Sequence, residues 1–354
     1  MPKIEILDNE VEFKKIDRSG MLAVVAQMPE MIAQAERFAA GVNLPKINNC
    51  RQVIVAGMGG SAIAGDIAAD IFYRQAAAPI TTVRNYSLPG GVGQDSLFFA
   101  MSYSGNTEET LQAAKEAANK KAKVICITSG GKLKELAESQ KYPLILIPTG
   151  LQPRAALPYL LTPLLLCLGK TGIGPLLDGE INEAVTLLTK LRDEWGLARA
   201  ARVNPAKQLA KKIVGRVPFI FGASGTTGSV AYRFKTQLNE NSKMTAVANV
   251  FPELDHNEIV NISLLKKETN NFALLVLRDE ADNERIKKRI EITKSLVSRQ
   301  IGAIEIAAQG RSQVAKLFSL ILFADLVSVY LAVLQGIDPT PVEIITRLKK
   351  EMSR

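Results

Sequence analysis

The segment SYSGNTEET, residues 102–110, places hydroxyl side chains around a glycine, between an apolar run and a helix-like run. Ser102, Ser104 and Thr107 could donate hydrogen bonds to an anion, and Gly105 would let the backbone approach that anion closely. Free N–H groups at the start of the helix would add further donors, so the pattern fits a phosphate. Serine, asparagine and threonine are also the usual caps of a helix, and the local pattern alone does not separate the two interpretations.

A second glycine-rich turn lies upstream, in GMGGS (residues 57–61), where Gly59 and Gly60 precede Ser61. It follows the apolar run QVIVA, so we expect it at the same carboxyl edge of a parallel sheet as the serine-rich turn. The glycines at 57, 59, 60 and 65 do not have the spacing of a dinucleotide-binding turn. No Gly-Lys-Ser/Thr sequence follows, so ATP is not expected as a ligand.

Candidate groups for proton transfer occur in the second half of the chain. Glu240 lies between two asparagines in FKTQLNENSKMTA, at the predicted C-terminal end of a helix. Sixteen positions later, ELDHNE contains His256, the only histidine of the chain. Both residue types can act as acids or bases, but most of them are surface or structural residues, and the pattern alone favours that interpretation.

A metal site is not expected. One histidine and three widely separated cysteines (Cys50, Cys126 and Cys167) supply too few ligands for zinc, and no pair of cysteines has the spacing of a metal site or of a disulfide framework. Because the glycine-rich turns also lack the spacing of nucleotide-binding motifs, we expect the protein to need no cofactor.

The composition is that of a globular protein with more than one domain, because the 354 residues are 47% hydrophobic and 22% charged. The formal net charge is +9, but basic and acidic residues alternate, as in RIKKRIEITKSLVSR, which favours a solvated surface over a nucleic-acid partner. The N-terminal segment MPKIEILDNEVEFKKID has no apolar core and does not resemble a signal peptide. Together with the separated cysteines, this indicates a cytoplasmic protein.

The stretch from Leu317 to Leu334 is nearly long and apolar enough to cross a membrane. Asp325 near its centre and two serines favour a buried helix instead, so no membrane association is expected. A helix that is apolar all round needs cover on every side, and that cover could come from its own domain together with a second subunit.

The elements that must position these residues are strand–turn–helix units. QVIVAGMGGSAIAGDIAAD, SLFFAMSYSGNTEETLQAAKEAANKK and KVICITSGGKLKELAESQ each combine a short apolar strand, a turn and a helix, which predicts a doubly wound parallel sheet. A second series begins at VPFIFGASGTTGSVAYRFKTQL and aligns loosely with the first. The sequence therefore predicts a protein of the α/β class with two similar domains.

The predicted organisation has five parts. They are a helical N-terminal segment (1–48), a first α/β domain (49–150), a helical connection (151–205), a second α/β domain (206–335) and a C-terminal helix (336–354). The prolines of DPTPVE are typical of the start of that last helix.

The motifs GMGGSAIAGD and SYSGNTEETL resemble the sugar isomerase (SIS) fold, which would make both α/β domains SIS domains in tandem. The pair NENSK and ELDHNE, together with IPTGLQPRAALPYL and the closing DPTPVEIITRLKK, is similar to the bifunctional phosphoglucose/phosphomannose isomerases. The two short glycine motifs are shared with sugar isomerase domains that only bind ligand, whereas the second group of motifs is more specific. The resemblance runs through most of the chain.

The resemblance implies an aldose–ketose isomerase that converts glucose 6-phosphate and mannose 6-phosphate to and from fructose 6-phosphate through a cis-enediolate. Ser102, Ser104 and Thr107, with Ser61 and the backbone of Gly59 and Gly60 nearby, would bind the hexose 6-phosphate. The resemblance also implies that Glu240 is the base that moves the proton and that Arg154 is the cation that stabilises the enediolate. His256 and a lysine of the final helix would act in ring opening. We choose Lys349 over Lys350 for that lysine, because Lys349 follows Leu348.

In related isomerases the active site lies at a dimer interface and the neighbouring subunit supplies the histidine. The resemblance thus also implies a homodimer with a shared active site. The alternative from another functional class is a regulator that binds a sugar phosphate without turnover, but a regulator would not need Glu240, His256 and Arg154. A glucosamine 6-phosphate synthase would need an N-terminal catalytic cysteine, whereas this chain begins with Met1 and Pro2.

Overall fold

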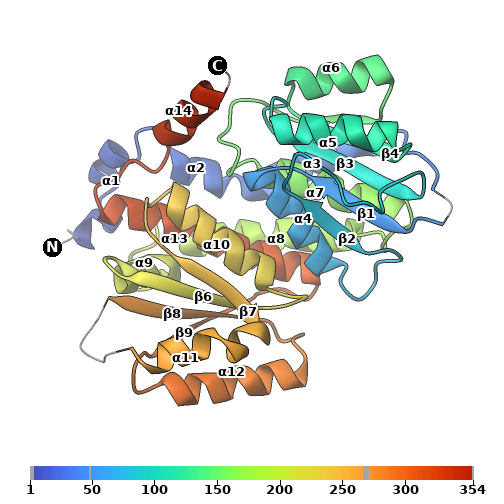
Figure 1. The fold of residues 1–354 in the computed structure, drawn as a ribbon. Helices are drawn as coiled ribbons and strands as arrows, with labels where there is room; N and C mark the ends of the chain where they lie inside the picture. Colours follow the sequence, from blue (N-terminus) through green and yellow to red (C-terminus); the bar gives the residue numbers. More distant parts are fainter. Residues whose placement is uncertain (1–3, 48, 266–270, 353–354) are drawn as a thin grey trace.

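The computed structural model describes residues 4–47, 49–265 and 271–352, and it contains two parallel sheets (Figure 1). The first sheet has the order β2-β1-β3-β4-β5. Its strands are β1 (Gln52–Ala56), β2 (Ile80–Val83), β3 (Ser96–Ser102), β4 (Lys123–Thr128) and β5 (Leu144–Leu146). The helices that follow β1, β3 and β4 are α4 (Gly59–Ile71), α5 (Glu108–Asn119) and α6 (Gly131–Gln140).

The second sheet repeats this arrangement with one strand fewer, in the order β7-β6-β8-β9. Its strands are β6 (Val217–Ala223), β7 (Val247–Phe251), β8 (Phe272–Arg278) and β9 (Ala303–Ala307). The associated helices are α10 (Gly228–Glu240), η2 (Glu253–His256), α11 (Glu258–Ser263) and α12 (Glu284–Val297). The predicted pair of α/β domains is thus confirmed. The sequence did not single out β2, β5 and β7, which are short strands with few fully buried positions.

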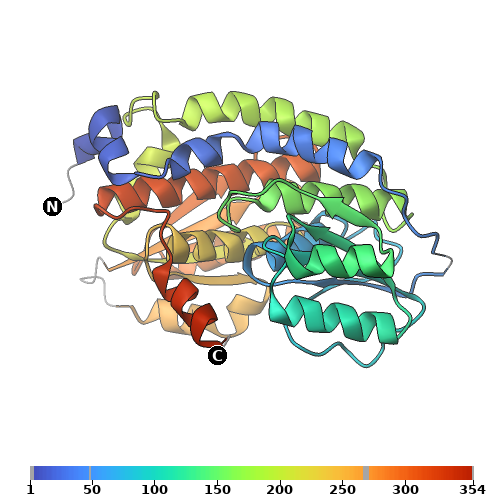
Figure 2. The same cartoon turned by 90° about the horizontal axis from the view of Figure 1, so that it is seen from above.

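The remaining helices, except the C-terminal one, form a layer against which both sheets pack (Figure 2). In chain order the remaining helices are η1 (Ile4–Asp8), α1 (Glu10–Ile16), α2 (Met21–Ala26), α3 (Met28–Ala40), α7 (Leu157–Lys170), α8 (Asp178–Trp195), α9 (Pro205–Ile213), α13 (Gln313–Leu334) and α14 (Glu343–Met352). Helix α3 contacts α7 and α8, and α13 contacts α8, α9 and α10. Helices from three separate parts of the sequence therefore build one common core.

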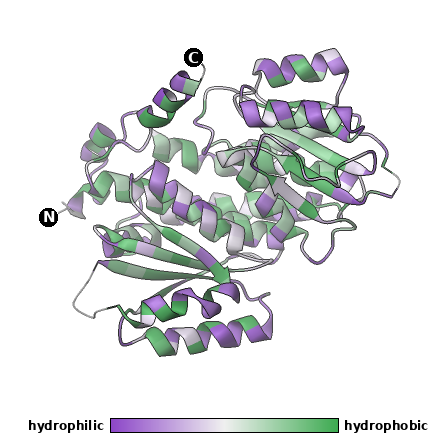
Figure 3. Cartoon of the chain, viewed as in Figure 1, coloured by the Kyte–Doolittle hydropathy of each residue, from purple (hydrophilic) through white to green (hydrophobic). Residues whose placement is uncertain are grey.

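The apolar stretch that raised the question of a membrane is the central helix α13 (Figure 3). By length and composition it is the one helix among the described residues that could cross a membrane, but it is fully buried within this chain. The expectation that a second subunit helps to cover it is not supported, because α8, α9, α10 and the N-terminal helices already pack around it. A predominantly apolar helix that is buried on every side here marks the centre of the fold.

Helices α4 and α10 connect the two α/β domains. Asp70, at the end of α4, accepts a hydrogen bond from the backbone N–H of Ser229 in the first turn of α10, over 2.9 Å. The two helices therefore contact each other with the end of α4 beside the start of α10. Burial raises the pKa of Asp70 to about 6, against the hydrogen bonds from Ser229, which lower it.

The buried Asp70 at the contact between α4 and α10 predicts that the stability of the protein depends on pH. The folded protein binds the Asp70 proton more tightly than the unfolded chain, so the stabilising effect is complete below about pH 4 and is lost as the pH rises through about 6. The difference between the two pKa values corresponds to at most roughly 3 kcal/mol. Asp70→Asn keeps an acceptor oxygen without the charge, so we expect a higher midpoint of thermal unfolding than wild type at pH 8 and an equal one at pH 4.

Asp66→Asn is the matched control, because Asp66 lies one turn earlier on α4 and forms an ion pair with Arg84. Its removal deletes a carboxylate that already has a cationic partner, and it should not stabilise the protein at pH 8. Equal midpoints for Asp70→Asn and wild type at both pH values would show that the buried carboxylate costs nothing.

Candidate active site

The serine-rich turn after β3 brings together two of the predicted phosphate ligands. Ser102 Oγ lies 2.8 Å from Thr107 Oγ1 and accepts a hydrogen bond from the N–H of Gly105 over 3.1 Å. Thr107 is the N-cap of α5, but its side chain makes no capping hydrogen bond. The first N–H groups of α5 have no partner inside the helix and are available to an anion. Ser104 is exposed, and its Oγ accepts from the N–H of Asn106.

Gly105 allows this turn to approach the next one. Its φ is +70°, and a Cβ there would lie only 1.7 Å from the carbonyl oxygen of Gly130. Any larger residue would force apart the turns that follow β3 and β4, which end side by side in the sheet. The glycine of SYSGNTEE is therefore required by the packing as well as by its backbone conformation.

The turn after β1 lies beside the serine-rich turn. Ser61 is buried in the first turn of α4, and its Oγ accepts a hydrogen bond from the N–H of Tyr103 over 3.2 Å. Gly60 touches a different segment, because a Cβ there would lie 2.6 Å from the carbonyl oxygen of Pro153 and 3.3 Å from Cα of Arg154. The two predicted phosphate-binding turns and Arg154 thus belong to one region of the structure.

Arg154 and Glu240, 86 residues apart in the sequence, form an ion pair in this region. Arg154 Nη1 lies 3.3 Å from Glu240 Oε2. The arginine side chain is only 3% exposed, whereas the glutamate side chain is 29% exposed, so a small molecule could reach the carboxylate without displacing the arginine. Glu240 is the last residue of α10, as the sequence predicted.

The arginine is held on nearly all sides. Its Nε donates to Asn241 Oδ1 over 2.6 Å, and its Nη2 donates to the carbonyl oxygens of Pro339 and Thr340 over 2.9 Å each. A guanidinium has five N–H groups, and these three bonds and the Glu240 pair use four of them. Within the described residues, one N–H on Nη1 is left for a ligand oxygen.

Burial and nearby charges act in opposite directions on this arginine. Burial lowers the pKa of Arg154, while the carboxylates of Glu240 and Asp325 raise it. An arginine keeps its charge under such conditions, so the site holds a buried cation beside a partly open carboxylate. That combination suits a reaction in which a proton is removed and negative charge develops on an oxygen.

Two residues of the NENSK motif support the site, although the sequence analysis gave neither a role. Asn241 binds the arginine, as described above. Lys243 Nζ donates to the carbonyl oxygens of Glu240, over 2.7 Å, and Pro339, over 3.0 Å. Lys243 has a φ of +54°, which is uncommon for a non-glycine residue and is often found near functional sites. That conformation cannot be read from the sequence, because lysine does not favour it.

His256 and Lys349 are not brought to Glu240 by any contact within the described chain. His256 is exposed at the end of η2, and no hydrogen bond or ion pair joins it to Arg154 or Glu240. Lys349 is exposed on α14, as is the alternative Lys350. Their predicted part in ring opening stays a prediction.

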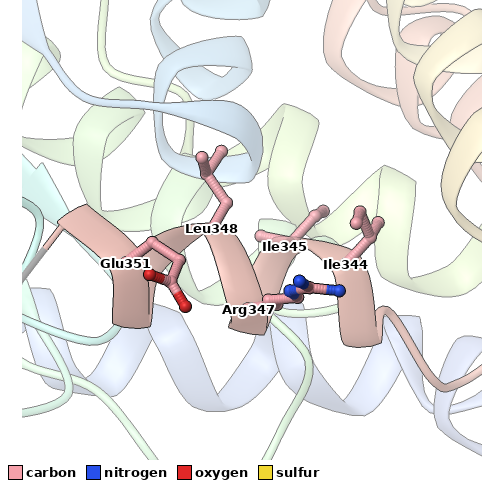
Figure 4. Close-up of a pocket in the computed structure, with 5 residues that line it drawn as sticks. All are labelled: Ile344, Ile345, Arg347, Leu348 and Glu351. Atoms are coloured by element: carbon pink, nitrogen blue, oxygen red, sulfur yellow. The ribbon is translucent and has the colours of Figure 1, made fainter.

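Helix α14 has no buried residue. Ile344, Leu348 and Met352 lie along one side of it and are between 61% and 74% exposed. A shallow pocket of about 350 Å³ beside the helix is lined by five of its own residues, Ile344, Ile345, Arg347, Leu348 and Glu351 (Figure 4). The described residues therefore leave the apolar side of α14 exposed to solvent. Lys349 lies on the same helix.

No group of three or more His, Cys, Asp or Glu side chains comes together as a metal site in the part of the chain that the structure describes. The cysteines Cys50, Cys126 and Cys167 are all free thiols.

Comparison with protein families matches both domains. Residues 46–149 match the SIS domain, and residues 202–352 match the bacterial phospho-glucose isomerase C-terminal SIS domain. A bifunctional phosphoglucose/phosphomannose isomerase of Caldicellulosiruptor bescii is 41% identical over 94% of this chain and 99% of its own length. A D-glucosamine-6-phosphate 4-epimerase of Sulfolobus acidocaldarius is 32% identical over 87% of this chain and 91% of its own length.

Solved structures with low sequence identity share the fold. A hypothetical protein of Thermus thermophilus superposes with a TM-score of 0.73 at 15% identity, and the match covers 99% of this chain and 94% of the other. At this identity the match shows the shared fold alone.

Proposed function

The chain belongs to the family of bifunctional phosphoglucose/phosphomannose isomerases, and we propose that its site interconverts glucose 6-phosphate and mannose 6-phosphate with fructose 6-phosphate. Its activity as a sugar-phosphate isomerase follows from relatives such as the Caldicellulosiruptor bescii protein. The proposal adds the substrates and assigns the residues that act on them. The observation that carries it is the ion pair of Arg154 with Glu240 beside the two glycine-rich turns.

Glu240 is the proposed base. An aldose and its ketose differ in the positions of two hydrogens, one on carbon and one on oxygen. A single base that reaches both C2 and C1 can remove the proton from C2 and return it to C1, while the hydroxyl proton at C2 passes to the oxygen at C1. Glu240 Oε2 is held by Arg154, and the side chain remains partly open to solvent at the end of α10. A return of the proton to C2 after rotation about the C2–C3 bond would give the mannose epimer.

Arg154 is the proposed partner of the charge that develops. Removal of the C2 proton places negative charge on the oxygen at C1, giving a cis-enediolate. The remaining Nη1 N–H of Arg154 is buried and fixed in direction by the other four donors, so it needs little reorganisation to bind that oxygen.

We propose that the phosphate binds at the N-terminus of α5, where Ser102 and Thr107 meet and Ser61 lies against the same turn, with the exposed Ser104 as a further donor. This part of the substrate does not react, so its binding energy can orient the sugar against Glu240. The backbone of Gly59 and Gly60 borders the same space, because Gly60 lies against Pro153.

We further propose a homodimer that works in the cytoplasm and shares its active site. Two observations support a second subunit. The apolar side of α14 is uncovered, and the exposed His256 makes no contact with the Arg154–Glu240 pair within the described residues. A neighbouring copy could cover the apolar side of α14 and bring its own His256 to the sugar ring.

The function is tested by supplying fructose 6-phosphate and measuring glucose 6-phosphate and mannose 6-phosphate with separate coupling enzymes. We expect both products. Unphosphorylated fructose should show a kcat/KM roughly 10⁴-fold lower, because hydroxyl and N–H donors left without their anion are costly.

Three other results would change the assignment. Binding of fructose 6-phosphate without any product would favour the regulator. Conversion of glucosamine 6-phosphate at C4 would favour the activity named for the Sulfolobus acidocaldarius relative. Similar turnover of fructose and fructose 6-phosphate would remove the two glycine-rich turns from the site.

A further inference from the structure

A chain of hydrogen bonds leads from the buried helix α13 to Arg154. Ser328 Oγ donates its proton to the carbonyl oxygen of Asp325, one turn earlier in α13, over 2.6 Å. The same Oγ lies 2.8 Å from Asn241 Nδ2, and Asn241 Oδ1 lies 2.6 Å from Arg154 Nε. Ser328 and Asn241 are both 0% exposed, so water does not compete for these bonds.

The direction of each bond follows from the first one. The single proton of Ser328 is used by the carbonyl of Asp325, so its oxygen has only lone pairs for Asn241. Asn241 must then present its NH₂ group to Ser328, which turns its carbonyl oxygen toward Arg154 Nε. With the amide reversed, Asn241 Oδ1 would face the lone pairs of Ser328 Oγ, and Asn241 Nδ2 would face the N–H of Arg154 Nε. Neither pair could form a hydrogen bond.

We propose that Ser328 and Asn241 are positioning residues that fix the guanidinium of Arg154 for the enediolate. The inference rests on the proposed function and adds to it residues with no contact to the substrate. If the amide of Asn241 can rotate, Nε of Arg154 loses its acceptor, and only the bonds to Glu240, Pro339 and Thr340 still hold the remaining Nη1 N–H in its direction. The arginine would then stabilise the enediolate less, whereas the binding of the neutral sugar would change little.

The same turn of α13 also holds the backbone of Arg154. Asp325 Oδ2 accepts from Arg233 Nη2 over 2.6 Å, and that nitrogen also donates to the carbonyl oxygen of Arg154 over 3.0 Å. Gln237 Nε2 donates to the other oxygen of Asp325 over 2.8 Å. Asp325 therefore has partners on α10, and through Arg233 it supports the main chain at Arg154.

Ser328→Ala removes the hydroxyl with little change in volume. Ser319→Ala is the matched control, because Ser319 also lies buried in α13, donates to a carbonyl one turn earlier, that of Lys316, over 2.7 Å, and accepts one hydrogen bond, from the N–H of Gln309, over 2.8 Å. Both variants should lose similar stability. Only Ser328→Ala should lose activity, by about tenfold to a hundredfold in kcat with little change in KM, the effect of one weakened bond to a charged group.

A binding measurement separates positioning from a general structural effect. The Kd of a phosphorylated aldonohydroxamate, which imitates the planar negative enediolate, should rise by the same factor as kcat falls in Ser328→Ala. The Kd of a hexitol 6-phosphate should stay at the wild-type value in both serine variants. Its phosphate is charged, but its polyol part carries no charge for the arginine to bind.

The inference is overturned if Ser328→Ala keeps the wild-type kcat, or if Ser319→Ala loses as much activity. It is also overturned if both ligands bind Ser328→Ala equally more weakly. These outcomes differ from a failure of the proposed function, in which the wild-type enzyme itself would not form glucose 6-phosphate or mannose 6-phosphate from fructose 6-phosphate.

Discussion

Replacing Glu240 by glutamine is expected to lower kcat for fructose 6-phosphate by roughly a hundredfold to ten-thousandfold, the usual size for the loss of a general base. The amide has nearly the shape of the carboxylate, so the contact with Arg154 at 3.3 Å can persist through its oxygen. The phosphate is bound elsewhere, and the Kd of hexitol 6-phosphate should therefore change little.

The assay should follow proton transfer directly as well as turnover. In D₂O, the wild-type enzyme is expected to exchange the C2 hydrogen of glucose 6-phosphate with solvent, and Glu240→Gln should lose this exchange to the same extent as kcat. Glu291→Gln is the control, because Glu291 is an exposed glutamate of α12 paired with Arg278 and Lys294. A near-normal rate for Glu240→Gln would mean that another group is the base.

The second large effect is a gain of activity from two inactive variants. Glu240→Gln and His256→Ala chains are unfolded together and refolded as an equal mixture. If the histidine comes from the neighbouring subunit, each mixed dimer has one site with both changes and one site with neither. Half of the dimers are mixed and half of their sites are intact, so about a quarter of the wild-type activity should return.

A second mixture shows whether the gain is specific. Glu240 and Arg154 face each other within one chain, so mixing Glu240→Gln with Arg154→Met leaves every site with one change, and no activity should return. If the first mixture also stays inactive, while mixed dimers are shown to be present, His256 does not act across the interface. The exposed position of His256 would then need another explanation.

Much of the fold could be predicted because its signals are local. The turns GMGGS and SYSGNTEE each follow a short apolar strand and precede a helix, and both stand where expected, at the start of α4 and α5. A strand, a glycine and a helix start lie within about ten residues of each other, so the sequence determines their arrangement without tertiary contacts. The short strands β2 and β5 were not predicted, since they become strands only by pairing at the two edges of the first sheet.

The site could be predicted only in part from the residues themselves. The resemblance selected Arg154 and Glu240. The pattern around Glu240 alone favoured an ordinary surface residue, and no pattern singled out Arg154. Their ion pair depends on the contact of α4 with α10 and on the approach of Pro153 to Gly60, which join distant parts of the chain. The roles of His256 and Lys349 stay predictions, because within the described chain neither contacts this pair.

The sequence by itself determined the α/β class, the tandem domains, the family and the two glycine-rich turns, because strand and helix periods and the residues of tight turns are local properties. Only the tertiary structure decided which distant residues meet. Asp325 appeared in the sequence as a charge inside an apolar helix; in the structure, Arg233 and Gln237 are its partners. A buried polar group must find its partner wherever the packing places one, and the sequence distance between them is not constrained.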